Sequence, residues 1–166
     1  MDSQKESKIV PKQLGTKKNN TSTGKDKIKY RKKRIGLPDL QSNVQNLLNM
    51  LNQNDINGFS KCKKISRKSS KRLSNRQSKY IGVSRNGNYW QVLKNHDQKK
   101  KYIGGFTEEL EAAISYDFYS MIIDLNQART NFEYSEELVR EMVATFMSDD
   151  QVFKPADYVS RLSLAK

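Results

Sequence analysis

Lysine and arginine are the chemistry-bearing side chains whose number and spacing stand out in this sequence. Of 166 residues, 31 are Lys or Arg and 18 are Asp or Glu, which gives a formal net charge of +13. Residues 1–79 carry 21 basic and 5 acidic side chains, whereas residues 80–166 carry 10 and 13. Because each cation that neutralises a phosphate releases a counterion, this asymmetry predicts a polyanionic partner. The alternatives are a solubilising tail or a nuclear address alone.

The densest basic segment is residues 61–79, where nine of 19 residues are Lys or Arg and none is acidic. The intervening Ser and Asn residues give it no apolar face. We therefore predict that residues 52–77 are a basic linker or arm that leads into a folded domain. The phosphate contacts expected from this region are Lys61, Lys63, Lys64, Arg67, Lys68, Lys71, Arg72, Arg76 and Lys79.

Side chains for enzymatic or metal chemistry are scarce. His96 is the only histidine and Cys62 the only cysteine. This excludes an internal disulfide, a cysteine-rich zinc site, a two-histidine metal site and any triad with a second histidine. Gly104-Gly105 lacks the Lys-Ser/Thr sequel of a phosphate loop. We expect no enzyme, no metal and no cofactor.

Hydrophobic residues make up 35% of the chain, and the mean hydropathy is −0.88. Both values favour one compact unit beside disordered segments. Residues 1–38 are predicted to be a disordered basic tail, and the run at 29–34 resembles a nuclear localisation signal. No apolar run approaches the length of a membrane span, and the N-terminus has no hydrophobic signal segment. We therefore expect a soluble nuclear protein without membrane contact.

Residues 39–51 are predicted to form a short amphipathic helix. Its apolar residues recur at helical spacing, namely Leu40, Val44, Leu47, Leu48 and Leu51. The sequence leaves open whether this helix docks on the main domain, on a partner or on nothing.

Three short strands follow. Residues 80–84 are β-prone, and Asn86-Gly87 is a strong hairpin signal because both residues tolerate positive φ. Residues 89–93 form a second strand, with Trp90 and Val92 on one face and Gln91 and Leu93 on the other. A polar turn at 95–98 precedes a third strand at 101–106, so the three strands make an antiparallel meander.

A helix should pack on this sheet. Thr107 is a suitable N-cap, and the helix should end near Asn126, which tolerates the left-handed conformation. Ala112-Ala113 would let the helix lie close to the sheet, which leaves the other sheet face exposed. Ser135 should cap a further helix over residues 135–147, within a C-terminal helical extension at 136–166. Its apolar stripe is Leu138, Val139, Met142, Val143 and Phe146.

The predicted fold class is therefore α+β. A three-stranded antiparallel sheet packs on one α-helix, with a basic disordered N-terminal arm and an additional C-terminal helix.

Residues 78–135 resemble the APETALA-2/ethylene-response-factor domain. Ser78 to Val83 is similar to its Tyr-Arg-Gly-Val opening, and Tyr102 to Phe106 is similar to its Trp-Leu-Gly-x-Phe strand. Glu111 to Asp117 is similar to its Glu-Ala-Ala-x-Ala-Tyr-Asp helix, and Thr130 to Phe132 to its closing Leu-Asn-Phe. Trp90-Gln91-Val92 is similar to the second strand. These pieces follow the family's order within a region that spans 58 of the 166 residues.

The resemblance implies that the sheet lies in the major groove of double-stranded DNA, with alternate residues facing bases and phosphates. When the family's residue roles are carried over by position, the resemblance implies that Lys100 is a further phosphate contact. It also implies that Asp117 supports the structure of the domain. The implied base-reading residues are Ser84, Arg85, Asn86, Asn88, Gln91, Leu93, Asn95 and Tyr102.

Three departures from the family bear on the target. Ile81 and Ser84 stand where family members place arginines, and the first turn is about one residue shorter. By the alternation of strand residues, Lys94 should point to the side of the sheet that faces the helix. The last point suggests that the second strand ends or twists at Leu93. A guanine-rich site is therefore not implied. Arg85 could pair with guanine, and Asn88 or Gln91 with adenine.

The leading interpretation is a sequence-specific double-stranded DNA-binding protein and transcription factor. One alternative is an RNA- or ribosome-associated structural protein that reuses the fold. Another is an adaptor that binds a protein partner through the apolar stripes at 40–51 or 138–146.

Overall fold

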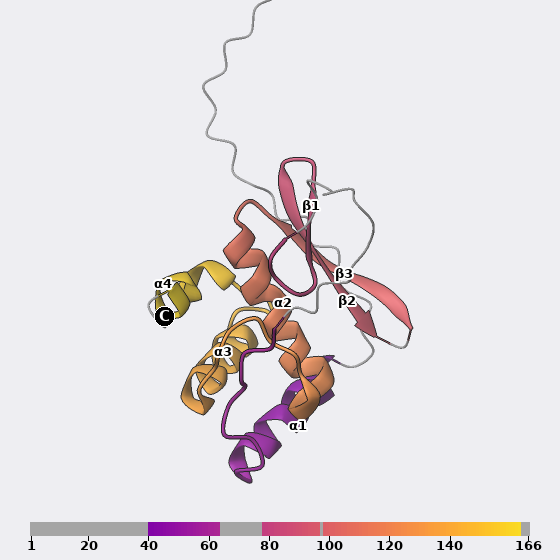
Figure 1. The fold of residues 1–166 in the computed structure, drawn as a ribbon. Coiled ribbons are helices and arrows are strands. Elements are labelled where there is room, and N and C mark those ends of the chain that lie inside the picture. The colour runs from indigo at the N-terminus through magenta and orange to yellow at the C-terminus, as the bar shows by residue number, and fades with distance from the viewer. Residues whose placement is uncertain (1–39, 64–77, 97, 164–166) are drawn as a thin grey trace, which may run out of the picture.

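The computed structural model describes residues 40–63, 78–96 and 98–163 (Figure 1). The predicted disordered tail at 1–38, Asp97 and the arm at 64–77 lie outside the described residues. The elements, in chain order, are α1 (Leu40–Asn52), β1 (Val83–Asn86), β2 (Tyr89–His96), β3 (Lys99–Phe106), α2 (Glu109–Asp124), η1 (Leu125–Gln127), α3 (Glu136–Ser148), η2 (Pro155–Tyr158) and α4 (Val159–Ser163). The predicted α+β class with one three-stranded antiparallel sheet is confirmed.

The first hairpin forms as expected, but its turn lies one residue later than predicted. Asn86 pairs with Tyr89 as the last residue of β1, so the two central turn residues are Gly87 and Asn88. Gly87 supplies the left-handed backbone, with a φ of 61°. A hairpin whose first central residue is glycine matches the right-handed twist of its strands.

The second hairpin is longer than predicted. β2 runs to His96 and β3 begins at Lys99, two residues before the expected start. Of the two alternatives expected at Leu93, an end of the strand is wrong and a local twist is what the structure has. The register instead shifts between Val92 and Leu93, and such a bulge raises the local twist without ending the strand.

The ends of α2 also differ from the prediction. The N-cap is Glu108 rather than Thr107, and no side chain caps the helix. β3 extends to Phe106, so the chain needs Thr107 to leave the sheet before the helix can begin. At the other end the positive φ lies at Leu125, with 51°, and not at Asn126 as expected.

Two hydrophobic cores share α2, which lies between the sheet and the other helices (Figure 1). On the sheet side, Ala112, Ala113 and Tyr116 pack against a cluster formed by Val83, Val92 and Phe106. The small Ala112-Ala113 pair permits the close approach that was predicted. On the far side, α2 packs against α1, α3 and α4 through Ile114, Phe118, Met121 and Ile122. The helix α2 within residues 78–135 therefore shares a hydrophobic core with α1, α3 and α4.

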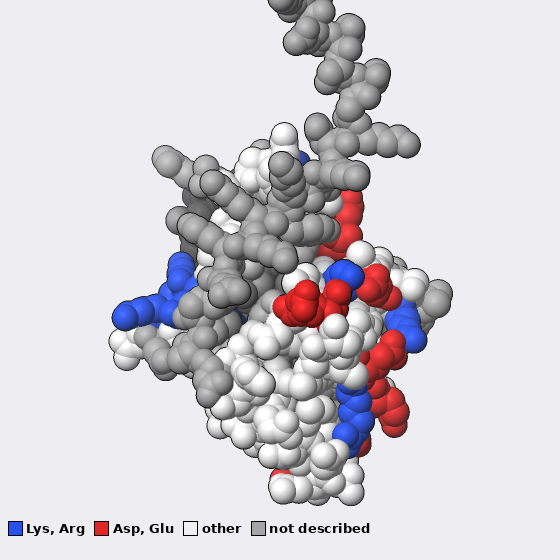
Figure 2. Space-filling model, turned by 180° about the vertical axis from the view of Figure 1, so that it is seen from behind, with Lys and Arg blue, Asp and Glu red and all other residues white. Residues whose placement is uncertain are grey.

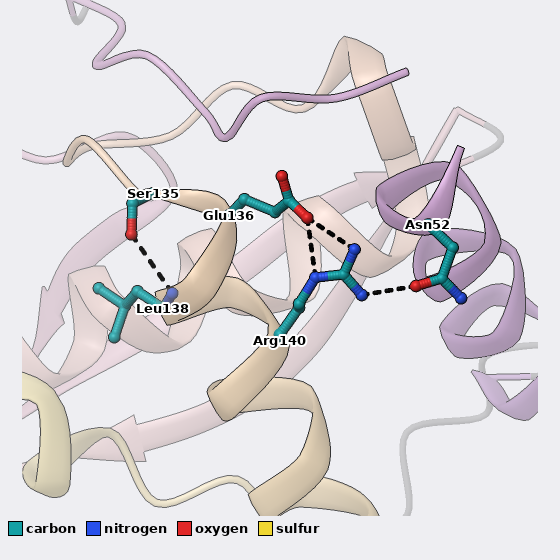
Figure 3. Close-up of polar contacts among 5 residues, drawn as sticks. All are labelled: Asn52, Ser135, Glu136, Leu138 and Arg140. Carbon is teal, nitrogen blue, oxygen red and sulfur yellow. Dashed lines mark hydrogen bonds and ion pairs between the residues drawn. The ribbon is translucent and has the colours of Figure 1, made fainter. Parts of the chain in front are cut away.

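The helix α1 docks inside the chain, which answers the question that the sequence left open. Val44, Leu47 and Leu51 are buried against α2 and α3. Arg140 of α3 ties the two helices together, because its Nη1 donates to Asn52 Oδ1 at 2.6 Å (Figure 3). Its Nη2 also pairs with Glu136 at 2.6 Å.

The apolar stripe of α3 is buried in the same core, at Val139, Met142, Val143 and Phe146. Ser135 caps α3 as predicted, by accepting a hydrogen bond from the Leu138 backbone N–H (Figure 3). The buried residues of both stripes therefore make their contacts within this chain.

The beginning of the predicted linker is packed rather than extended away. Phe59 and Tyr134 exchange backbone hydrogen bonds of 2.8 and 2.9 Å, and Cys62 N–H donates to the Thr130 carbonyl at 2.9 Å. A Cβ on Gly58, whose φ is 109°, would lie 2.2 Å from the Tyr134 carbonyl oxygen. This tight approach anchors residues 58–62 to the chain that follows α2.

Candidate nucleic-acid interface

The sheet face turned away from α2 carries most of the predicted base-reading residues. Cross-strand pairing fixes this face, because residues directly opposite each other point to the same side. The pairs on it are Ser84–Gln91, Asn86–Tyr89, Leu93–Tyr102, Asn95–Lys100 and Gln91–Gly105. We call this surface the outer face. No described helix packs on it.

A hydrogen-bonded row of polar side chains crosses β1 and β2 on the outer face. Gln91 Nε2 donates to Ser84 Oγ at 3.0 Å, and Asn86 Nδ2 donates to Gln91 Oε1 at 3.4 Å. The structure therefore brings three of the predicted readers together. Ser84 and Asn86 thereby fix the orientation of the Gln91 amide.

Two tyrosines form the apolar part of the same face. Tyr89 is 52% exposed and Tyr102 is 46% exposed. The Tyr102 hydroxyl lies 3.0 Å from the position that a Cβ on Gly105 would take. The missing side chain at Gly105 thus gives the Tyr102 ring room to lie along β3 toward Gln91.

Tyr89 was not among the predicted readers. The alternation of strand residues could have assigned Tyr89 to the outer face, since it is two residues before Gln91.

Arg85 does not lie on the outer face, contrary to the expectation from the resemblance. It pairs with Trp90, on the sheet side that faces α2. Its guanidinium lies over the Trp90 ring, 5.6 Å from the centroid, and its Nε donates to the Gly87 carbonyl at 3.3 Å. The expectation is wrong because Arg85 and Ser84 are adjacent in one strand, and adjacent residues point to opposite sides. Asn88 is exposed in the turn.

The inward side of the sheet is closed by the residues predicted for it. Val92 and Phe106 are buried, and Trp90 and Ile103 pack against the same cluster. Lys94 shares this side and is only 6% exposed. Its ammonium forms an ion pair with Asp124 and lies 5.3 Å from the centroid of the Tyr116 ring. An inward lysine is thus compatible with a continuous strand.

Basic side chains mark the edges of the outer face. Lys99 and Lys100 are exposed at the turn between β2 and β3, and Figure 2 shows basic side chains at the edge of the molecule where this turn lies. Lys79 is exposed beside Tyr80, with its ammonium 5.1 Å from the ring centroid. Lys61 and Lys63 are exposed in the packed segment before the arm. The other predicted phosphate contacts, Lys64, Arg67, Lys68, Lys71, Arg72 and Arg76, lie outside the described residues.

The described residues contain no group of three or more His, Cys, Asp or Glu side chains that could hold a metal ion. Over the same ranges, no helix has the length and apolar character needed to cross a bilayer. His96 is the last residue of β2 rather than part of the turn.

No model of a protein family matches this chain, and no solved structure matches it.

Proposed function

We propose that this chain is a sequence-specific double-stranded DNA-binding protein that regulates transcription in the nucleus. In this proposal the outer face enters the major groove, which is wide enough for a β-sheet surface. The basic arm supplies phosphate contacts, and their electrostatic attraction holds the sheet against the duplex.

The observation that carries the proposal is the composition of the outer face. Ser84, Asn86, Gln91 and Asn95 bear hydrogen-bonding groups, and Tyr89 and Tyr102 bear exposed rings. Two exposed aromatic rings on one sheet face favour a binding surface over a face that only contacts solvent. The resemblance of residues 78–135 to the APETALA-2/ethylene-response-factor domain supports the same reading.

A competition experiment at a stated salt concentration tests the proposal. The full chain is incubated with a random duplex DNA pool, and bound molecules are selected and sequenced. A recoverable motif that structured RNA does not displace supports DNA reading. Displacement of the DNA by structured RNA would instead favour a chain that binds RNA. Absence of binding to either nucleic acid at physiological salt would refute the proposal.

A further inference from the structure

The outer face has a chemical bias that goes beyond binding to DNA in general. We infer that it reads an A·T base pair, with Gln91 as the residue that recognises adenine and with Leu93 and Tyr102 against a thymine methyl group. This inference rests on the proposed function, because it concerns the same surface.

The Gln91 amide is held in place before any ligand binds. Its Nε2 donates to Ser84 at 3.0 Å and its Oε1 accepts from Asn86 at 3.4 Å. A side-chain amide has two N–H donors and two acceptor lone pairs, so each atom keeps one position for a ligand. One donor and one acceptor are what the N7 and N6 edge of adenine requires. A side chain that is already ordered also loses less entropy on binding.

Apolar groups lie directly beside this amide. Tyr102 pairs with Leu93 across the two strands, and its hydroxyl approaches Gly105, the residue opposite Gln91. The ring therefore extends from Leu93 toward the amide on the same face. In the major groove the C5 methyl of thymine is the apolar feature that such a surface contacts.

The same face lacks the groups that read guanine. Arginine and lysine bind the O6 and N7 atoms of guanine. Arg85 is turned to the other side of the sheet against Trp90. The one cation among the described pairs of the outer face is Lys100, which lies near the turn opposite Asn95, beyond Leu93 from the Gln91 amide. The centre of the outer face therefore carries the Gln91 amide and no guanidinium group.

The decisive variant is Gln91→Glu. The carboxylate can still accept from Ser84 and Asn86, so the local network survives, but the donor to adenine N7 is lost. A carboxylate accepts from the N4 amino group of cytosine. Sites selected by the wild-type chain should prefer adenine at one position by about five- to 150-fold. Gln91→Glu should move that preference to cytosine.

The matched control is Gln41→Glu, the same chemical change at an exposed position of α1. It should leave the selected motif unchanged, and the thermal unfolding midpoints of both variants show whether the fold is intact. Replacing thymine by uracil in the selected site removes the methyl group. This should weaken wild-type binding by about fourfold, and it should weaken binding by Leu93→Ala less, because only Tyr102 then remains against the methyl group.

The outcomes separate this inference from the proposed function. Duplex binding with a motif in which Gln91→Glu changes no base preference would overturn the adenine assignment and leave DNA binding in place. A motif centred on guanine would do the same. Failure to recover any duplex motif would overturn both.

Discussion

Asp117 and Asn131 are joined by hydrogen bonds from both the backbone and the side chain of the asparagine. The Asn131 backbone N–H lies 2.8 Å from each carboxylate oxygen, and its Nδ2 donates to Oδ1 at 2.8 Å. The Asn131 amide continues to Ile81, accepting from its N–H at 2.6 Å and donating to its carbonyl at 3.2 Å. Through Asn131, one buried carboxylate therefore connects α2, the chain after it and the segment just before β1.

Asp117→Asn should destabilise the fold by about 2–4 kcal/mol. The carboxylate also accepts from the Phe132 N–H at 3.1 Å and from the Tyr134 hydroxyl at 3.0 Å. An amide nitrogen in place of one oxygen would face these donors with another donor. Urea unfolding above pH 7, where the Asp117 carboxylate is ionised because its pKa is about 7, measures the change. Asp55→Asn at an exposed position is the control. A loss no larger than that of the control would show that the network contributes little.

The same residue should give the free energy of unfolding a pH dependence. Burial raises the pKa of Asp117 to about 7, although the hydrogen bonds from Asn131, Tyr134 and Phe132 lower it. The folded chain then retains a proton between pH 4 and 7 that the unfolded chain has released. The stabilising contribution is complete below pH 4 and is lost as the pH rises to 7, with a slope of at most about 1.4 kcal/mol per pH unit. Urea titrations at several pH values should show this fall in the wild type and not in Asp117→Asn. Parallel curves for the two proteins would contradict it.

Gly82→Ala should be far more damaging than Gly87→Ala. A Cβ on Gly82 would lie 1.9 Å from the Tyr116 ring, whereas one on Gly87 meets no atom within 4 Å. Both backbones are left-handed, with φ values of 73° and 61°, so the conformational cost of about 1 kcal/mol is shared. The clash should add a further cost of about 1–3 kcal/mol. Thermal unfolding of the two variants compares them directly, and equal losses would mean that Tyr116 moves aside freely.

Removing one partner of the Lys94–Asp124 pair should have unequal effects. The Lys94 side chain is 7% exposed and that of Asp124 is 28% exposed. Asp124→Asn leaves a buried ammonium without its counter-charge and should cost about 3 kcal/mol. Lys94→Met keeps the apolar stem and leaves a carboxylate that water reaches, so it should cost less. Urea unfolding compares the free energies of unfolding of the two variants. A larger loss of stability for Lys94→Met than for Asp124→Asn would contradict the prediction.

The arm should control the salt dependence of DNA binding. Changing Lys64, Arg67, Lys68, Lys71, Arg72 and Arg76 to Gln removes six charges without touching a described packing contact. The slope of log K against log salt should become less negative by up to about five, since each phosphate contact contributes about 0.9. The matched control changes six lysines of the tail, Lys5, Lys8, Lys12, Lys17, Lys18 and Lys25. An equal effect from the control would assign the attraction to total charge rather than to the arm.

Local patterns predicted the elements well, because the information for a strand or a helix lies within a few residues. The alternation around Trp90 and Val92, and the Ser135 cap, lead directly to β2 and α3. The ion partner of Lys94 could not be predicted in this way, since Asp124 is 30 residues away and becomes adjacent only when α2 packs on the sheet.

Part of the site could be predicted from the same local patterns. Ser84, Gln91 and Tyr102 were assigned to one face by the alternation of strand residues, whereas Arg85 was assigned from the turn of the domain that the sequence resembles. A shift of one residue in the turn is enough to reverse the side on which a strand residue lies. The docking of α1 needed tertiary structure, because its stripe has the same appearance whether its partner is in this chain or in another.

The position of α2 between two cores limits how this protein can be divided. Its residues Ala112 to Ile122 are all buried, so a fragment ending near Ser135 would uncover Phe118, Met121 and Ile122. The 58-residue segment that resembles a known domain therefore lacks the helices that cover these side chains. A fusion protein or a domain swap that carries the outer face elsewhere would have to transfer α1, α3 and α4 with it.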